Sequence, residues 1–216
     1  MSAEASLLPC PPPPPLSERV LRLVIGLWVR VCYRFRVRGR EHLPRHGAAV
    51  LVCNHVSFID GLLVGIATRR KVRFVMDHHI FENRALHWFF RTVGAIPIAP
   101  RSEDLAVRER AFEQIAAALR AGELLCIFPE GMITHTGRMN EFRPGVERIL
   151  AATRVPVIPL ALRGLWGSFF SRKDGPAMRK APRRVRAKIE LRCGAPVPPQ
   201  LATAPMLQAR VGELLA

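Results

Sequence analysis

Short apolar runs, each about one strand in length, recur along the chain and alternate with helical patterns. The run "AAVLVC" at Ala48–Cys53 is representative, because no charge interrupts it and it stops at a polar pair. A continuous apolar run of this kind is characteristic of a strand that is buried on both faces. The predicted strands are Ala48–Cys53, Val72–Met76, Ala95–Ile98, Leu124–Phe128, Val155–Leu162 and the alternating segment Val185–Arg192.

Helical periodicity fills the intervals between these strands. It is clearest in Asp104–Ala121, where an apolar stripe recurs every three to four residues and Gly122 provides a stop. The other predicted helices are Phe58–Ala67, Ala85–Thr92 and Val146–Ala152. Strands interleaved with helices predict a single α/β domain with a mixed, largely parallel sheet flanked by helices. In such sheets the functional residues gather at the carboxyl ends of the strands.

The strand end "NHVSFID" is the first candidate site. On one ideal helix, His55 and Asp60 would point roughly 140° apart, so a contact between them requires a turn in the chain. Ser57 and Asp60 fit a capping box that would supply this turn and open a helix at Phe58. Asp60 would then orient one ring nitrogen of His55 and leave the other as a base. The plainer alternative is a solvated His beside a helix cap.

Two more strand ends carry residues suited to ligand binding. "FPEG" places Glu130 and Gly131 directly after a strand, and a Gly at such a position lets the backbone approach a ligand. "IPIAPRS" presents Arg101, whose planar guanidinium suits a phosphate group. Taken singly, these features are also compatible with an ordinary turn and a solvated Arg.

Considered together, the motifs resemble a known family. "NHVSFID", "IPIAPRS", "FPEG" and "VPVIPLAL" appear in the order and approximate spacing of the four motifs of glycerophospholipid acyltransferases, a resemblance that extends over nearly all of residues 20–200. The longer run "FPEGMITHTGRMNEFRPG" is similar to the acyltransferase module of bacterial enzymes that reacylate lysophospholipids.

The resemblance implies an activity and assigns roles to four residues. His55 would be the general base that takes the proton of the acceptor hydroxyl, and Asp60 would orient it. Glu130 and Gly131 would help to hold the glycerol part of the acceptor. The implied reaction transfers a fatty acyl group from acyl carrier protein or coenzyme A to the free hydroxyl of a lysophospholipid. It requires no metal and no organic cofactor.

The resemblance also implies which groups recognise the rest of the substrates. Arg101 would bind the acceptor phosphate, and Val155–Leu162 would line the acyl-donor side. Pro97 departs from the family, which usually has an aromatic or aliphatic residue there, so Arg143 in "FRPG" is a competing phosphate ligand. The favoured acceptor is 1-acylglycerol-3-phosphate, which would give phosphatidic acid. The alternative acceptor is 2-acylglycerophosphoethanolamine.

The N-terminal region predicts a peripheral membrane protein. Residues 1–15 form a Pro-rich tail that we expect to be disordered, and the resemblance implies an acyltransferase domain over residues 16–216. An amphipathic helix over about residues 17–35 would lie on an anionic membrane surface or pack on the protein's own core. Its longest uncharged stretch, Leu23–Val29, is far too short to span a bilayer. The expected location is therefore the cytoplasmic side of the cell membrane.

Charge and cysteine content leave rival classes to weigh. The net charge of +16 predicts acidic partners, and nucleic acid is disfavoured because the chain lacks basic residues interleaved with aromatic ones. A thioesterase, using water in place of the lipid hydroxyl, is the second rival. Five cysteines without a Cys-x-x-Cys pair indicate a reducing cytosol.

Two other patterns suggest different chemistry. "MDHHI" suggests a metal, but adjacent residues of an extended chain point in opposite directions, so we expect none. Cys53 or Ser57 could be a nucleophile beside His55, yet neither lies in a Gly-x-Ser-x-Gly elbow.

Overall fold

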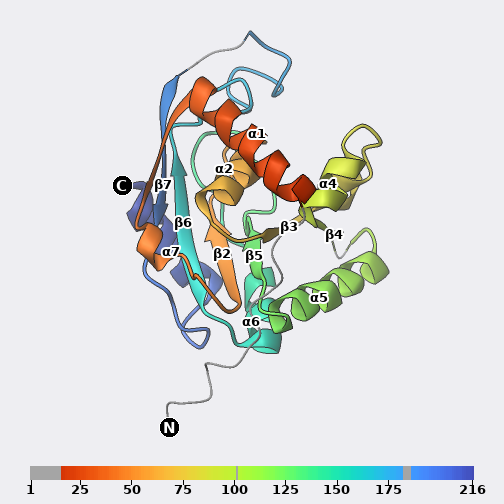
Figure 1. Ribbon diagram of the computed structural model, residues 1–216. Coiled ribbons are helices and arrows are strands. Elements are labelled where there is room, and N and C mark those ends of the chain that lie inside the picture. Colours follow the sequence, from red (N-terminus) through yellow and green to blue (C-terminus); the bar gives the residue numbers. More distant parts are fainter. Residues whose placement is uncertain (1–15, 101, 182–185) are drawn as a thin grey trace.

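A seven-stranded sheet forms the centre of the computed structural model, which describes residues 16–100, 102–181 and 186–216 (Figure 1). The strand order is β1-β7-β6-β2-β5-β3-β4, and every neighbouring pair is parallel except β6 with β7. The strands are β1 (Tyr33–Arg38), β2 (Ala49–Cys53), β3 (Val72–Asp77), β4 (Ile96–Ile98), β5 (Leu124–Ile127), β6 (Val157–Arg163) and β7 (Ala187–Cys193). The predicted α/β fold with a mixed, largely parallel sheet is confirmed.

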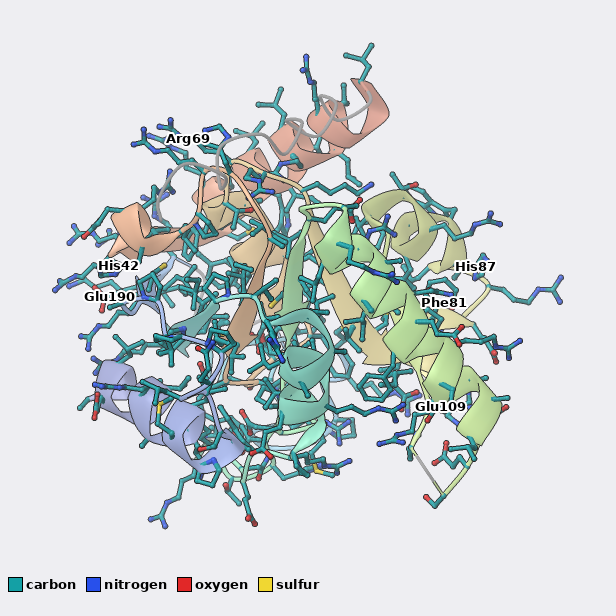
Figure 2. All side chains as sticks on the ribbon, turned by 90° about the horizontal axis from the view of Figure 1, so that it is seen from below. His42, Arg69, Phe81, His87, Glu109 and Glu190 are labelled. Atoms are coloured by element: carbon teal, nitrogen blue, oxygen red, sulfur yellow. The ribbon has the colours of Figure 1, made fainter. Side chains whose placement is uncertain are left out.

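Helices cover both faces of the sheet. They are α1 (Leu16–Cys32), α2 (Asp60–Ala67), α3 (His78–Phe81), α4 (His87–Val93), α5 (Leu105–Arg120), α6 (Gly145–Thr153) and α7 (Ala204–Leu215), with a short 3-10 helix η2 (Arg40–His42). Figure 2 shows α1 on one side of the strands and α6 and α7 on the other. Two hydrophobic cores result, one beneath α1 and α2 and one beneath α5, α6 and α7.

The central strands explain the apolar runs of the sequence. All five residues of β2 are buried, and β2 lies between β5 and β6 in parallel register with both. Since helices cover both faces at this point, no position of the strand meets water and none is polar. The first polar side chains of this part of the chain therefore come after Cys53, where the strand ends.

The N-terminal helix is shorter than predicted. It ends at Cys32, and the residues from Tyr33 onward form β1, so the prediction of a helix over about 17–35 is wrong for its last three residues. The reason is the alternation in "YRFRVR", which has the period of a strand and not of a helix. The Pro-rich tail predicted for residues 1–15 lies outside the described residues.

Helix α1 is attached through few side chains. Val29 is buried in the core, and Arg22 donates hydrogen bonds to the carbonyl oxygens of Gly65, Thr68 and Arg70 at the C-terminal end of α2. The apolar stripe on the other side of α1 is exposed to solvent and comprises Leu16, Val20, Leu23, Val24, Leu27 and Val31. Packing on the protein's own core thus leaves most of this stripe uncovered. Among the described residues, no helix is both long and apolar enough to cross a membrane.

Candidate active site

Asn54 fixes the position where the chain leaves β2. Its side-chain amide donates to the carbonyl oxygen of Leu162 at 3.1 Å, and its oxygen accepts the Leu162 N–H at 2.7 Å. In a parallel ladder these two groups of Leu162 would bond to two different peptide groups of β2, and here one side chain takes the place of both. The buried amide therefore extends the ladder by one step without further strand, and the backbone turns away immediately after it.

The turn brings His55 and Asp60 together as the sequence predicts. His55 Nδ1 lies 2.9 Å from Asp60 Oδ2. The same carboxylate oxygen accepts the backbone N–H groups of Val56 at 2.6 Å and Ser57 at 2.9 Å. The other oxygen accepts the Ser57 hydroxyl at 2.6 Å. Because an ionised carboxylate can only accept hydrogen bonds, Nδ1 carries the proton, and Nε2 holds the basic lone pair.

The predicted capping box forms only in part. The Ser57 N–H binds the Asp60 carboxylate as expected, but the Ser57 hydroxyl binds the same carboxylate and caps no backbone N–H. Helix α2 consequently begins at Asp60, with Ile59 before it, and not at Phe58. Both groups of Ser57 serve to hold the carboxylate, because Asp60 is fully buried and needs all of these donors.

Phe128 holds the imidazole from one side. The two ring centroids are 4.2 Å apart and the planes are inclined by 18°, so the rings are stacked. Phe128 follows β5, which lies beside β2 in the sheet. The imidazole is thereby fixed both by a hydrogen bond at Nδ1 and by contact with a flat apolar surface.

Glu130 joins the ends of two strands. One of its carboxylate oxygens accepts the backbone N–H of His55 at 2.6 Å, and the other accepts the N–H of Asn140 at 2.7 Å. Burial raises the pKa of Glu130 above its usual value, although these two N–H groups oppose the rise. The sequence predicts Glu130 as a substrate ligand, and the structure shows that it also fixes the backbone of the general-base candidate.

Gly131 and Arg143 lie in contact. Gly131 has a φ of 70°, and a Cβ at this residue would stand 2.9 Å from the guanidinium of Arg143. The backbone N–H of Arg143 donates to the carbonyl oxygen of Pro129 at 2.9 Å, which anchors the segment. Arg143, predicted as an alternative phosphate ligand, is thus brought next to the other site residues. Arg101 lies outside the described residues.

A cavity of about 200 Å³ opens beside these residues. Its wall includes Asn54, His55, Val56, Glu130, Thr134, Gly137, Arg138, Met139, Leu162, Arg163, Gly164, Trp166 and Leu215. A cavity of about 250 Å³ between α5 and α6 contains none of them. The indole of Trp166 lies against Gly137, where a Cβ would be only 2.6 Å from it. The sequence did not single out Thr134, Gly137 or Trp166 as parts of this wall.

Several backbone amides near the site are already engaged. Among the candidates for stabilising an oxyanion, the Ser57 N–H binds Asp60, the Phe58 N–H binds the carbonyl oxygen of Phe170, and the Gly131 N–H binds that of Phe128. Within the described residues, no acceptor is recorded for the N–H groups of Ile59 and Glu130. These two amides are the remaining candidates at the strand ends.

The structure argues against Cys53 and Ser57 as nucleophiles. Burial raises the pKa of the Cys53 thiol far above its ordinary value, and the side chain is fully enclosed. A protonated, enclosed thiol is neither nucleophilic nor reachable. The Ser57 hydroxyl is buried too and donates to Asp60. Of the three side chains considered for this site, His55 therefore remains the candidate for its chemistry.

The "MDHHI" segment gathers groups that can bind a metal. Ligand atoms of His78, His79 and Glu82 lie within 4.8 Å of one another. The Nε2 atoms of both His residues are 3.3 Å from one oxygen of Glu103. Asp77, which the sequence pattern also includes, accepts the His79 N–H and caps α3.

These features define an α/β protein with a site suited to general-base chemistry at the carboxyl ends of parallel strands. The family model described as Acyltransferase matches residues 34–163, and the chain belongs to that family.

Similar proteins agree with this membership. The chain is 28% identical over 158 residues to a chloroplastic 1-acyl-sn-glycerol-3-phosphate acyltransferase of Arabidopsis thaliana, covering 69% of this chain and 43% of the relative. It is 30% identical over 149 residues to a chloroplastic 1-acyl-sn-glycerol-3-phosphate acyltransferase of Brassica napus, covering 65% and 42%. The matched region thus spans less than half of each of these two relatives.

A solved structure shares the fold. The crystal structure of the 1-acyl-sn-glycerophosphate acyltransferase PlsC from Thermotoga maritima matches with a TM-score of 0.66 and 20% sequence identity. The match covers 92% of this chain and 77% of that one. At this identity the likeness supports the fold alone.

Proposed function

We propose that the protein is an O-acyltransferase that moves a fatty acyl group from a thioester to the free hydroxyl of a lysophospholipid. The favoured acceptor is 1-acylglycerol-3-phosphate, and the product is phosphatidic acid. The observation that carries the proposal is the His55–Asp60 contact of 2.9 Å at the wall of a cavity. The names of the plant relatives support the choice of acceptor, since both are 1-acyl-sn-glycerol-3-phosphate acyltransferases.

The proposed reaction proceeds without a covalent enzyme intermediate. His55 Nε2 takes the proton of the acceptor hydroxyl as its oxygen attacks the thioester carbonyl, so a C–O bond forms. The C–S bond then breaks, and the proton passes from the imidazolium to the departing thiolate. Asp60 stabilises the imidazolium that exists between these two steps. A positioned base of this kind typically contributes about 10²- to 10⁴-fold to the rate.

The headgroup of the acceptor would be bound by cationic side chains. Arg143 lies against Gly131, next to the Glu130 segment, and its exposed guanidinium can bind a phosphate with two parallel hydrogen bonds. Arg101 remains proposed as a second phosphate ligand on the basis of its motif. Glu130 and Gly131 would hold the glycerol part of the acceptor in addition to positioning the base.

The exposed stripe of α1 supports attachment to a membrane. Leu23 and Leu27 have exposed fractions of 73% and 64%, which is unusual for large apolar side chains on one helical face. Inserting such a stripe into the boundary of a lipid leaflet removes it from water, and nearby basic residues favour an anionic leaflet. We therefore propose that the protein is peripheral, on the cytoplasmic side of the cell membrane.

The test is acyl transfer to a panel of lysophospholipids. We expect wild-type protein to form diacyl product with 1-acylglycerol-3-phosphate, and we expect His55→Ala to lose transfer while keeping its circular dichroism spectrum. His46→Ala, a change at an exposed His in a loop, serves as the matched control and should retain activity. Transfer by His55→Ala at the wild-type rate would exclude the mechanism.

The same reaction mixtures separate the alternatives. Free fatty acid in place of diacyl product would indicate a thioesterase. A preference for 2-acylglycerophosphoethanolamine that persists in Arg143→Ala would replace the phosphate acceptor by the alternative one. Tight, salt-sensitive RNA binding without any acyl transfer would favour the nucleic-acid class.

A further inference from the structure

One face of the β1–β7 edge of the sheet is strongly basic. The parallel register pairs Arg34 with Lys188 and Arg36 with Glu190, and the antiparallel register places Arg163 of β6 beside Glu190 from the other side. The intervening residues of β1 and β7 point into the core beneath α1, so these polar residues share the opposite face. We call this set the basic sheet face: Arg34, Arg36, Arg38, Arg163, Lys188, Glu190 and Arg192.

Three cations of the basic sheet face form no hydrogen bond or ion pair within the part of the protein that the structure describes. Glu190 pairs with Arg38 and Arg192, and its pKa is lowered mainly by the hydrogen bond from Arg192. By contrast, Arg34, Arg36 and Lys188 are exposed and have no hydrogen bond or ion pair with any residue that the structure describes. With six cations and one anion, the face carries a formal charge of +5.

The basic sheet face reaches the wall of the active-site cavity. Arg163 and Gly164 line that cavity at the carboxyl end of β6. Gly164 packs against the carbonyl oxygen of Lys188, leaving no room for a Cβ. Because β7 is antiparallel to β6 and parallel to β1, the N-terminal ends of β1 and β7 lie at this same edge. Of the three exposed cations Arg34, Arg36 and Lys188, the first and the last therefore lie toward the cavity end of their strands.

The position of the basic sheet face in the fold indicates which kind of partner can bind there. It lies on the side of the sheet opposite α1, so attachment to a bilayer through the α1 stripe turns it toward water and away from lipid headgroups. Its length from Arg34 to Arg38 is about 13 Å at roughly 3.3 Å per residue, comparable with the diameter of a helix and its side chains. The set contains no aromatic side chain on which a nucleic-acid base would stack.

We propose that the basic sheet face docks the acidic surface of an acyl carrier protein, which delivers its thioester-bound acyl group to the cavity beside His55. This inference rests on the proposed function and names the partner that supplies the donor. Complementary charge raises the rate of encounter and fixes the orientation of the partner, and both effects weaken as salt rises. The unpaired cations near the cavity would then guide the carrier to the entrance.

The test compares two donors with the same acyl chain, acyl carrier protein and coenzyme A. The variant Arg36→Glu/Lys188→Glu reverses two exposed charges on the face. The control Arg45→Glu/Arg110→Glu makes the same change in net charge at exposed residues of a loop and of α5. We expect the face variant to raise KM for acyl carrier protein by about tenfold or more, with kcat and the KM for acyl-CoA within about twofold of wild type.

Direct binding gives an independent readout. Isothermal titration of holo acyl carrier protein into the full chain should show binding that weakens with salt and is lost in the face variant but kept in the control. An equal effect in both variants, an equal loss with acyl-CoA, or a wild-type protein that uses only acyl-CoA would overturn the proposal. A wild type that transfers from neither donor would instead overturn the proposed function.

Discussion

Replacing Asp60 by Asn would test the catalytic pair with little change of shape. The amide oxygen of Asn can occupy the position of Oδ2 and accept from His55 Nδ1, Val56 N–H and Ser57 N–H. Its NH₂ group would then face the Ser57 oxygen, which can turn its own proton away and accept. The geometry around the imidazole is kept, and the negative charge is lost.

Two magnitudes follow from this arrangement. A hydrogen bond to a charged group stabilises the fold by about 1 kcal/mol more than a neutral one. Because Val56 and Ser57 donate three such bonds to Asp60, we expect the substitution to lower the free energy of unfolding by about 3 kcal/mol. Unit charges about 4 Å apart attract by ~4 kcal/mol at an effective dielectric constant of 20. Solvent reaching the partly exposed imidazole reduces this, so we expect kcat to fall by about 10²- to 10³-fold.

The assay measures kcat at saturating substrate together with urea unfolding. The matched control is Asp104→Asn, because Asp104 lies far from this site in the sequence and caps α5 by accepting the Val107 N–H. We expect the control to lose at most about 1 kcal/mol of stability and no activity. A wild-type kcat in Asp60→Asn, with the expected loss of stability, would refute the view that the carboxylate stabilises an imidazolium during transfer.

Three further outcomes are expected. Gly131→Ala should lower the free energy of unfolding by about 1–2 kcal/mol because Gly131 has a φ of 70°, and it should raise KM for the acceptor because the new methyl group displaces Arg143. The control is Gly26→Ala, which should not destabilise the protein because nothing lies within 4 Å of the added Cβ. Leu23→Asp/Leu27→Asp should abolish co-sedimentation with anionic vesicles, while the melting temperature stays unchanged because both side chains are exposed. Co-sedimentation at the wild-type level would exclude the α1 stripe as the site of membrane attachment. Exhaustive treatment with a chelator should leave transfer unchanged, because the proposed proton transfers need no metal; loss of transfer that is restored by a divalent cation would contradict this.

The fold was largely predictable because strands that are buried on both faces of the sheet appear in the sequence as continuous apolar runs. The apolar run at Ala48–Cys53 became β2 with a shift of one residue at its start. Strand β1 was missed because "YRFRVR" follows a helix directly, without a Gly or Pro to mark the change of period. Helix α7 was missed although its start is marked by Thr203, whose side chain accepts the Met206 N–H.

The part of the site that depends on a contact between two side chains was predictable. The contact of His55 with Asp60 follows from the requirement for a turn at Ser57 and is observed. The partners of Glu130 were not predictable, since both are backbone N–H groups, and any residue type supplies those. The substrate roles of Glu130 and Arg143 stay predictions until the variants are measured.

The hydrogen bonds from Arg22 to the end of α2 have a mechanical consequence. They clamp the C-terminal end of a helix whose first residue is Asp60. Helix α2 is eight residues long, about 12 Å, and links the carbonyl groups bound by Arg22 to Asp60. In the proposed membrane-bound state, α2 therefore connects the helix that contacts the leaflet with the residue that orients His55, so a displacement of α1 at the membrane would reach the catalytic pair through one short helix.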